Sequence, residues 1–498
     1  MKIDAQLPDN IEQLKALLIR QENEINQLKQ QNQHLLEQFR LAQQRQFGKS
    51  SEGFVGQGEL FDEVEEVQTT EIVETETINY KRKKPVRTPL PKDLPREEII
   101  HDIVDKNCDC CGHDLHQMGE DRSEKLEFIP ACIKVMVHIR PKYSCRYCEK
   151  HGSKTTIKQQ PMPPSPIPKG FATPSLLAQL ISSKYQYGLP LYRQESLFKQ
   201  YGIELSRKTM SNWILKSSTL FKPLIEKFIE TLLKQNVIHA DETTVNVINS
   251  DKIKSYMWVY CTGSDSPNEN RVIPNIVLFD YQNSRAGVCP VNYLAGFDGY
   301  LQVDGYAGYE QTDATLVGCM AHARRYFMDA KKAQPKGKNG KADMALSYFQ
   351  KLYAIETKFK TKTIDEKYQA RKTQAKPILE KLYHWLTKQN IVPKSALGKA
   401  IKYCINQWAK LIRYLEDGQL NIDNNRAERA VKPFVIGRKN WLFSQTANGA
   451  NASATLYSII ETAKANGLIP FDYLVQCLEE LSHPEPDIDS LLPWNIKR

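Results

Sequence analysis

The chain has 498 residues, a formal net charge of +10 and 41% hydrophobic residues. This length supports two to four domains, each with its own core, and excludes a small disulfide-stabilised scaffold. The sequence offers no run of about eighteen apolar residues for a membrane span, and its start, MKIDAQLPDN, lacks the apolar segment of a signal peptide. We therefore expect a cytoplasmic protein with no membrane association, and the clustered basic residues indicate a polyanionic partner.

Residues 1–47 contain a seven-residue repeat. One register holds Ile11, Leu18, Ile25, Asn32 and Phe39, and the other holds Leu14, Gln21, Leu28, Leu35 and Ala42. This is the pattern of a coiled-coil seam, in which a single core asparagine favours two strands in fixed register. The repeat predicts a homodimer or higher oligomer; the alternative is one amphipathic helix lying on its own protein.

Residues 48–100 turn acidic and then basic and proline-rich, without steady periodicity. This composition is typical of a linker whose charges are solvated, with contact between the basic part and DNA left open. Residues 101–160 follow and hold two cysteine pairs with two residues between members, Cys108 with Cys111 and Cys145 with Cys148. Two such pairs can complete a four-sulfur structural zinc site, and the strand-like alternation from Ile133 to Ile139 predicts a hairpin that brings them together.

The exact zinc ligands stay open, because Cys110 is a spare thiol and because His113 or His116 could replace a sulfur. The alternative for the whole set is buried free cysteines, which would not require paired spacing.

Residues 161–235 read as helices, at 175–184, 192–201 and 206–217, and Ser206 or Thr209 is placed to cap the third. A short turn containing Gly202 joins the last two helices and resembles a helix-turn-helix, whose second helix would carry Arg207 and Lys208 into a major groove. The alternative is a helix pair that belongs to the core.

Residues 236–330 change to strand patterns, at 237–248, 256–261, 276–281 and 300–304. Asp241 lies in the middle of the first strand, where a charge costs free energy unless a metal or an ion pair compensates it, and Glu242 points the other way. Asp304 comes where the last strand gives way to a glycine turn, a position suited to a hard divalent cation, although aspartate before glycine also occurs in ordinary turns.

Residues 331–420 are lysine-rich, and their pattern predicts an insertion of helices. Residues 461–498 are expected to form a C-terminal tail.

Residues 421–460 begin with a predicted helix, which we expect to end at Pro433 after about two turns. Glu428 projects from this helix. Its spacing from Asn425 is that of a capping box, so a local cap is the simplest interpretation, although a cap and a metal ligand are compatible.

Asp241, Asp304 and Glu428 together form a three-carboxylate set suited to two magnesium ions in phosphoryl transfer. Four segments strengthen this hypothesis because they resemble the DDE transposases of the insertion sequence sixty-six family: Asp241-Glu-Thr-Thr, Gln302-Val-Asp-Gly-Tyr-Ala-Gly-Tyr309, Met320-Ala-His-Ala-Arg-Arg325 and Asn424-Asn-Arg-Ala-Glu-Arg429. The resemblance covers nearly the whole chain, including the leucine-zipper-like segment and both cysteine pairs, and the doublet Cys110-Cys111 is its one departure.

The resemblance implies a multidomain α/β protein with an RNase H-like catalytic core, in which Asp241, Asp304 and Glu428 take the DDE positions and bind Mg²⁺ or Mn²⁺. It implies that His322, Arg324 and Arg325 lie near the site, as phosphate contacts or as a core histidine with solvated arginines. Arg429 and Lys432 flank Glu428 and are further hypotheses for DNA phosphates. The expected partners are the element ends and the target DNA, with helper proteins left open.

The expected activity is therefore cleavage of phosphodiester bonds at the element ends and joining of the freed 3′-end to target DNA. Two alternatives remain. The first is a catalytically silent dimeric DNA-binding protein, which has no need of the three carboxylates. The second is a structure-specific nuclease on the same fold, which would cut DNA without joining ends.

Overall fold

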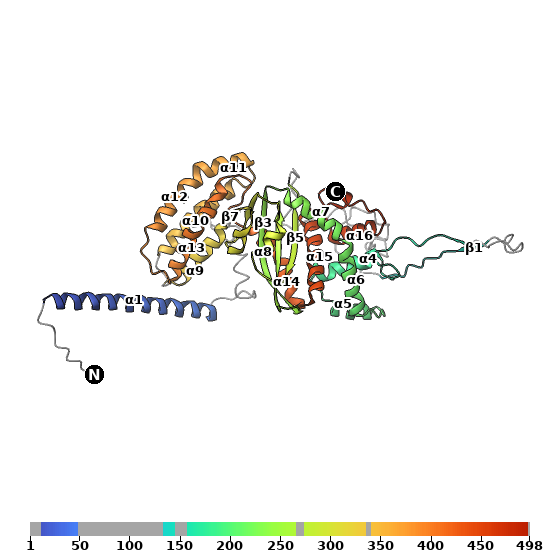
Figure 1. Cartoon of the computed structure of the whole chain (residues 1–498), viewed down its shortest axis with the longest axis horizontal. Coiled ribbons are helices and arrows are strands. Elements are labelled where there is room, and N and C mark those ends of the chain that lie inside the picture. Colours follow the sequence, from blue (N-terminus) through green and yellow to red (C-terminus); the bar gives the residue numbers. More distant parts are fainter. Residues whose placement is uncertain (1–10, 48–132, 145–156, 265–272, 335–339, 497–498) are drawn as a thin grey trace, which may run out of the picture. The chain divides into compact units, whose positions relative to one another are not determined.

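The computed structural model describes residues 11–47, 133–144, 157–264, 273–334 and 340–496. The chain divides into two units, one formed by residues 1–69 with 163–498 and the other by residues 70–162 (Figure 1). The predicted linker and the four predicted zinc ligands, Cys108, Cys111, Cys145 and Cys148, lie outside the described residues.

The N-terminal segment is a single helix, α1 (Ile11–Phe47), as the heptad repeat predicts. Its seam side chains Ile11, Leu18, Ile25, Leu28 and Phe39 are each at least half exposed. These exposed apolar side chains favour pairing of two helices, which stays a prediction. Glu37 and Arg40 of the same helix hydrogen-bond to the backbone of Ala396 and Ala333.

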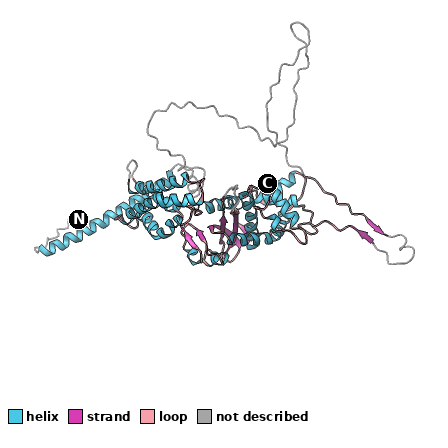
Figure 2. Ribbon diagram, turned by 90° about the horizontal axis from the view of Figure 1, so that it is seen from above, coloured by secondary structure: helices cyan, strands magenta, loops and turns pink. Residues whose placement is uncertain are grey.

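The second unit contains a short antiparallel pair, β1 (Lys142–Ser144) with β2 (Ile157–Gln159) (Figure 2). The expected strand from Ile133 to Ile139 is wrong, because residues 133–141 have no regular structure. Val135, Val137 and Ile139 are exposed. Alternation stabilises a strand only where one of its faces is covered, and nothing described covers this segment.

The helical region follows the prediction closely. It consists of α4 (Pro174–Tyr185), α5 (Leu191–Gln200), α6 (Arg207–Leu220) and α7 (Lys222–Leu233). Ser206 caps α6 by accepting a hydrogen bond from the Thr209 backbone N–H at 3.2 Å. Between α5 and α6, Gly202 has a φ of +74°, a left-handed conformation that glycine adopts without strain.

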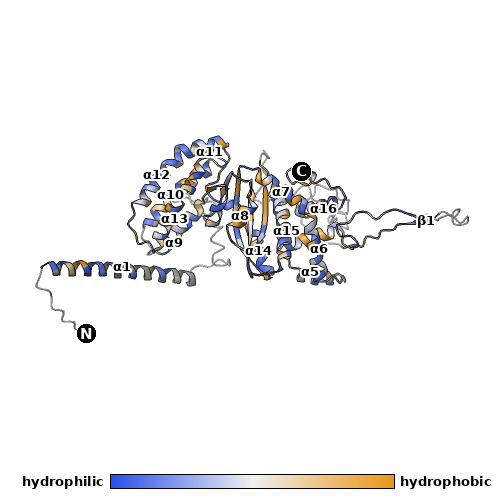
Figure 3. Ribbon diagram, viewed as in Figure 1, coloured by the Kyte–Doolittle hydropathy of each residue, from blue (hydrophilic) through white to orange (hydrophobic). Residues whose placement is uncertain are grey.

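The first unit is built on a mixed six-stranded sheet. Its strands are β3 (Val237–Asn249), β4 (Lys254–Thr262), β5 (Ile276–Gln282), β6 (Tyr300–Gln302), β7 (Thr315–Val317) and β8 (Ser444–Thr446). The order is β5-β4-β3-β6-β7, and β8 also pairs with β3. β3, β4 and β5 are antiparallel, whereas β6, β7 and β8 join in parallel. The central strands are strongly apolar (Figure 3), as expected for a sheet buried between helices.

The outer edge of the sheet, β5, is closed by the helix α15 (Ala447–Ala465). The hydroxyls of Ser458 and Thr462 accept hydrogen bonds from the backbone N–H groups of Phe279 and Val277, at 2.8 and 3.0 Å. These contacts satisfy donors that an edge strand would otherwise expose. The helix α16 (Pro470–Glu480) packs next to α15 and α4 and completes this side.

The predicted helical insertion is present and has its own hydrophobic core, which includes Phe327, Phe349 and Leu382. After α9 (Met320–Lys332), it comprises α10 (Lys341–Lys358), α11 (Ile364–Ala370), the π-helical turn η2 (Arg371–Ala375), α12 (Lys376–Thr387) and α13 (Ala396–Leu411). Within the described ranges, no helix is long and apolar enough to cross a bilayer.

The helix that carries Glu428, α14 (Asn425–Trp441), corrects two expectations. It continues through Pro433 instead of ending there, because Ala430, Val431 and Phe434 pack on the core and tertiary burial outweighs the lost hydrogen bond. The capping-box interpretation is also wrong. The first helical residue is Asn425, the residue before it makes no side-chain cap, and the Glu428 carboxylate caps nothing.

Candidate active site

Three elements each deliver one carboxylate to the same part of the sheet. Asp241 lies in β3, Asp304 follows the end of β6 by two residues, and Glu428 lies near the start of α14. β6 pairs with β3 in parallel, with Gln302 opposite His239, so both strands run toward their aspartates on the same side. The sequence predicts that the two aspartates come from neighbouring strands, and the pairing of β3 with β6 confirms that these strands are neighbours.

A network of amide side chains holds the start of α14 onto these two strands. Asn424 donates to the backbone carbonyl of Ala240 at 2.8 Å, and its Oδ1 lies 3.1 Å from Nδ1 of His239. Asn421 lies 3.2 Å from the other His239 nitrogen and exchanges two hydrogen bonds with the Gln302 amide. Buried polar groups that are paired in this way hold their segments in one arrangement.

The turn after Asp304 depends on a glycine. Gly305 has a φ of +123°, and an added Cβ would lie 3.0 Å from the Tyr403 hydroxyl. That hydroxyl, from the insertion helix α13, donates to the Asp304 backbone carbonyl at 2.6 Å, while Oδ1 of Asp304 accepts from the Tyr306 N–H at 2.8 Å. The insertion thus helps to fix the position of Asp304.

Burial and mutual repulsion disturb the protonation of these groups. The pKa of Asp241 is raised well above its ordinary value, first by burial and then by the charges of Glu242, Asp304 and Glu428. The charges of Asp304 and Glu428 therefore act on Asp241, but among the described residues the group whose ligand atoms lie within 4.8 Å of one another is Cys319, His322 and Glu428, without either aspartate. Asp241 accepts one backbone hydrogen bond, from Glu242 at 2.8 Å.

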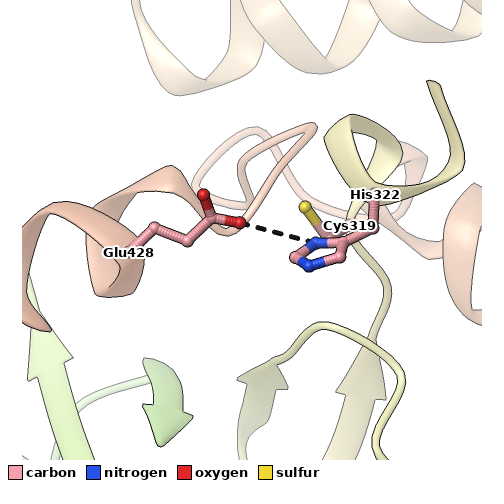
Figure 4. Close-up of side chains that lie close together, drawn as sticks. All are labelled: Cys319, His322 and Glu428. Carbon is pink, nitrogen blue, oxygen red and sulfur yellow. Dashed lines mark ion pairs between the residues drawn. The ribbon is translucent and has the colours of Figure 1, made fainter. Parts of the chain in front are cut away.

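Glu428 is the most isolated of these carboxylates. Its side chain is 2% exposed, and neither carboxylate oxygen has a hydrogen bond among the described residues. His322 Nδ1 lies 3.4 Å from Oε1 (Figure 4). An Arg325 nitrogen lies 3.8 Å from the same oxygen. Burial raises the pKa of Glu428 to about 7, opposed by Arg325 and supported by Asp423 and Asp304.

His322 and Cys319 lie directly beside Glu428. Their ligand atoms and that of Glu428 fall within 4.8 Å of one another (Figure 4). Burial, followed by the charge of Arg325, lowers the pKa of His322 to about 4, so the imidazole is neutral at pH 7. A neutral imidazole offers a lone pair to a cation and does not act as a cationic phosphate contact.

The residues present fit a divalent cation. A buried carboxylate without hydrogen bonds costs free energy, and several carboxylates in one cluster repel each other until a positive charge lies between them. Among the described residues, the close group of possible ligands is Glu428 with His322 and Cys319, and it offers a carboxylate oxygen and a neutral imidazole nitrogen to such a cation.

Glu242 is a neighbour whose environment the sequence did not indicate. Its side chain is 2% exposed, and its carboxylate is held by the Arg285 guanidinium and by the Tyr309 hydroxyl, the latter at 2.7 Å. Burial and the charge of Asp304 nevertheless raise its pKa. Tyr309 lies inside the quoted Gln302–Tyr309 motif, but only the fold shows what it holds. Cys319, His239, Asn421 and Asn424 were likewise not predicted as site residues.

The basic residues expected to contact DNA fall into two places. Arg324 and Arg325 on α9 and Arg429 and Lys432 on α14 belong to the helices beside the carboxylate cluster, with Arg429 and Lys432 exposed. Arg207 and Lys208 are exposed at the start of α6, where Arg207 forms an ion pair with Glu195 at 2.8 Å. The second group therefore belongs to the helix pair and not to the carboxylate site.

Buried carboxylates with raised pKa values in a mixed α/β core mark a candidate functional site, but the fold does not by itself identify the activity. Comparison with known families makes this specific. Residues 169–452 match the Transposase IS66 family, and residues 105–149 match the zinc-finger binding domain of transposase IS66. Residues 34–99 match the family described as Transposase C of IS166 homeodomain, and residues 458–494 match the IS66 C-terminal element.

Curated relatives agree over most of the chain. The uncharacterized protein y4jD of Sinorhizobium fredii (strain NBRC 101917 / NGR234) is 33% identical over 426 residues, which cover 82% of this chain and 81% of the relative. The uncharacterized protein y4qI of the same organism is 30% identical and covers 99% of this chain and 98% of the relative. The chain belongs to the IS66 transposase family. It is thus a DNA-binding, DNA-processing protein of an insertion sequence, with a zinc-finger domain and divalent-metal use.

Proposed function

We propose that this protein is a transposase that binds the ends of its insertion sequence and catalyses magnesium-dependent phosphodiester cleavage and strand transfer. The observation that carries the proposal is the state of Glu428, which is buried, has no hydrogen bond to either carboxylate oxygen among the described residues, and adds to the pKa rise of Asp241. His322 and Arg325 lie at 3.4 and 3.8 Å and make no hydrogen bond to it, so both carboxylate oxygens can accept an ion.

In this proposal Asp241, Asp304 and Glu428 are the catalytic carboxylates. When bound there, Mg²⁺ or Mn²⁺ would supply the positive charge that lowers the pKa of an attacking water or 3′-hydroxyl and stabilises the leaving oxygen. The protein orients the three carboxylates through the Asn424 and Asn421 amides, keeps His322 neutral, and offers Arg325 for the charge that develops on the phosphate.

Binding of the element ends is assigned to the helix pair α5–α6. The buried face of α6 includes Met210, Trp213 and Ile214. The opposite face exposes Arg207, Lys208, Asn212 and Lys216, which carry the donors that contact phosphates and base edges. The Gly202 turn gives the pair the compact connection of a helix-turn-helix.

We further propose that the mixed sheet with its helical insertion is an RNase H-like core, and that α1 pairs with a second copy. The core assignment is supported by the strand order and by the long separation of Glu428 from both aspartates. Dimer formation is supported by the exposed seam of α1.

The structural Zn²⁺ would be held by four cysteines that all lie within the zinc-finger match, Cys108, Cys111, Cys145 and Cys148. Binding to genomic DNA would place the chain in the cytoplasm.

The test uses duplex DNA cut from the flanks of the gene that encodes this chain, incubated with the protein and Mg²⁺. We expect nicking at one position in each end and transfer of that end to a second duplex. Asp304→Asn should abolish both products, whereas Asp298→Asn, at an exposed aspartate, should leave them unchanged. Equal cleavage by Asp304→Asn would overturn the proposal, and nicks without joined products would favour a nuclease.

A further inference from the structure

The turn that follows α14 holds two apolar side chains in water. Leu442 is 64% exposed and Phe443 is 46% exposed. Leu442 has φ +62° and ψ −42°, and the Phe443 N–H donates to the Trp441 carbonyl at 2.7 Å. This is a γ-turn with positive φ, a rare and strained conformation for a residue with a branched side chain.

Contacts on both sides hold the strained turn in place. Before it, Arg438 anchors the end of α14 to β3 by donating to the Thr243 hydroxyl at 3.2 Å and to the Thr244 carbonyl. After it, Ser444 in β8 pairs with Val247 of β3. Backbone strain persists only where the surrounding structure over-determines it, and such strain is concentrated at functional sites. Single exposed apolar residues are ordinary, but a braced turn that presents two of them is not.

The charge around the turn indicates what it contacts. Arg429, Lys432 and Lys439 are exposed on α14 at spacings of three and seven residues, so they share one face, which we call the basic stripe. The stripe begins next to Glu428 and leads to the turn. Lys252 is exposed on the β3–β4 connection and Lys254 is exposed as the first residue of β4, with Asp251 as an opposing charge. A net basic surface of this kind complements a phosphate backbone.

The turn also lies between the two regions assigned to DNA. Its neighbour Asn440 packs against Gly188, in the connection between α4 and α5, where an added Cβ would lie 2.8 Å from the Asn440 amide nitrogen. The other end of α14 carries Glu428. A duplex that reaches from the helix pair α5–α6 to the carboxylates would therefore pass the turn.

We propose that Leu442 and Phe443 form a wedge that inserts against the bases of the element end and unstacks them. This inference rests on the proposed function and adds to it a place where the DNA is deformed. Exposed apolar side chains beside cations act in this way on duplexes, and base–aromatic stacking needs no particular sequence. From Arg429 to Leu442 the helix rises about 20 Å at about 1.5 Å per residue. That length corresponds to roughly six base pairs from the cleaved bond at 3.4 Å per base pair.

The test places 2-aminopurine at successive positions of the flank-derived duplex and measures its fluorescence when the full chain binds. We expect a rise centred about six base pairs from the cleavage point. Phe443→Ala and Leu442→Gly should lose the rise and bind the duplex about 10-fold more weakly. Leu442→Gly is informative because glycine suits φ +62°, so the fold is not put at risk. Phe443→Tyr should retain the rise.

Two controls separate the possible failures. Ile469→Ala removes an apolar side chain of similar exposure, 65%, at the start of α16, and should keep the fluorescence rise. Asp304→Asn should keep the rise and lose cleavage. If the wild type and both wedge variants give the same fluorescence pattern, the wedge is wrong while the proposed function stands. If Asp304→Asn still cleaves, the proposed function fails whatever the fluorescence shows.

Discussion

Arg371 and Glu428 are both buried ionisable side chains, but Arg371 has many hydrogen-bond partners and Glu428 has none among the described residues. Arg371, in the π-helical turn of the insertion, is 2% exposed and donates two hydrogen bonds to the Glu356 carboxylate at 2.9 and 2.7 Å. It also donates to the backbone carbonyls of Tyr414, Asp417 and Leu420. Glu428 is as deeply buried and accepts no hydrogen bond among the described residues.

The difference separates a structural charge from a functional one. Every donor direction of Arg371 leads to an acceptor of the same chain, so its burial is compensated and it holds the insertion to the segment that precedes α14. Glu428 is held in place by its helix, but its carboxylate accepts no hydrogen bond among the described residues, and burial raises its pKa to about 7 although Arg325 at 3.8 Å opposes the rise. Such incompletely compensated burial is expected where a group must bind something from outside.

The largest expected effect is on activity at Glu428. Glu428→Gln keeps the shape of the side chain but removes its charge, and we expect DNA cleavage to fall at least about 10³-fold. The metal-free protein should unfold at the same or a higher urea concentration than the wild type, because a desolvated charge has been removed. Glu226→Gln, at an exposed position of α7, is the matched control for both measurements. A large loss of stability in Glu428→Gln would show that Glu428 is structural.

Arg371→Ala should give the opposite result. It leaves Glu356 and three carbonyls without their donor, and loss of one partner of a buried pair costs about 3–5 kcal/mol. We expect urea denaturation to show this loss of unfolding free energy, with weaker cleavage only in proportion to the unfolded fraction. Arg413→Ala removes a partly exposed ion pair with Glu416 and a hydrogen bond to the Leu316 carbonyl, so this control should cost less, about 1–2 kcal/mol. Equal stability of the Arg371 and Arg413 variants would contradict a structural role for the buried Arg371 hydrogen bonds.

The sequence predicts the elements better than it predicts their partners. The strands from Val237 to Tyr281 and the helices from 175 to 217 follow from local periodicity and caps, and the structure confirms them. The insertion between 331 and 420 follows from composition. The continuation of α14 through Pro433 does not, since it depends on packing of that helix against the sheet, which no local rule contains.

The site shows the same limit. Asp241, Asp304 and Glu428 can be selected from the sequence as unusual carboxylates, and a family resemblance can order them. Their predicted convergence depends on the parallel pairing of β3 with β6 and on amide contacts from Asn421 and Asn424, which are nonlocal. The burial of Arg371 and the closeness of Cys319 to Glu428 are nonlocal too, and a sequence pattern does not encode them.

Divalent metal should stabilise the protein through the carboxylate cluster. Mg²⁺ or Mn²⁺ at about 100 times its dissociation constant should add about 2.7 kcal/mol to the unfolding free energy, because only the folded chain assembles the cluster. The measurement is thermal unfolding across a metal titration with Zn²⁺ kept constant. Asp241→Asn should reduce the gain, whereas Arg371→Lys should lower the baseline and keep the gain. An identical gain in Asp241→Asn would mean that the metal binds elsewhere.

The smallest expected net effect is on the pH dependence of wild-type stability without added Mg²⁺ or Mn²⁺, because two groups act in opposite directions. The folded pKa of Glu428, about 7, lies above its ordinary value of 4.5, so the folded state binds a proton that the unfolded state has released. Stability from this group is complete below pH 4.5 and is lost as pH rises through 7, by at most about 1.4 kcal/mol per pH unit. His322 has the opposite sign, since its lowered pKa of about 4 makes stability fall as pH drops below 6.5. The contributions of Glu428 and His322 to stability therefore offset each other between pH 4.5 and pH 6.5.

Comparison of the wild type with Glu428→Gln isolates the contribution of the glutamate. The stability advantage of the variant should grow between pH 5 and about pH 7 and then level off. If the difference in unfolding free energy between the variant and the wild type stays constant across that range, the Glu428 carboxylate is solvated and is not the buried group contrasted with Arg371.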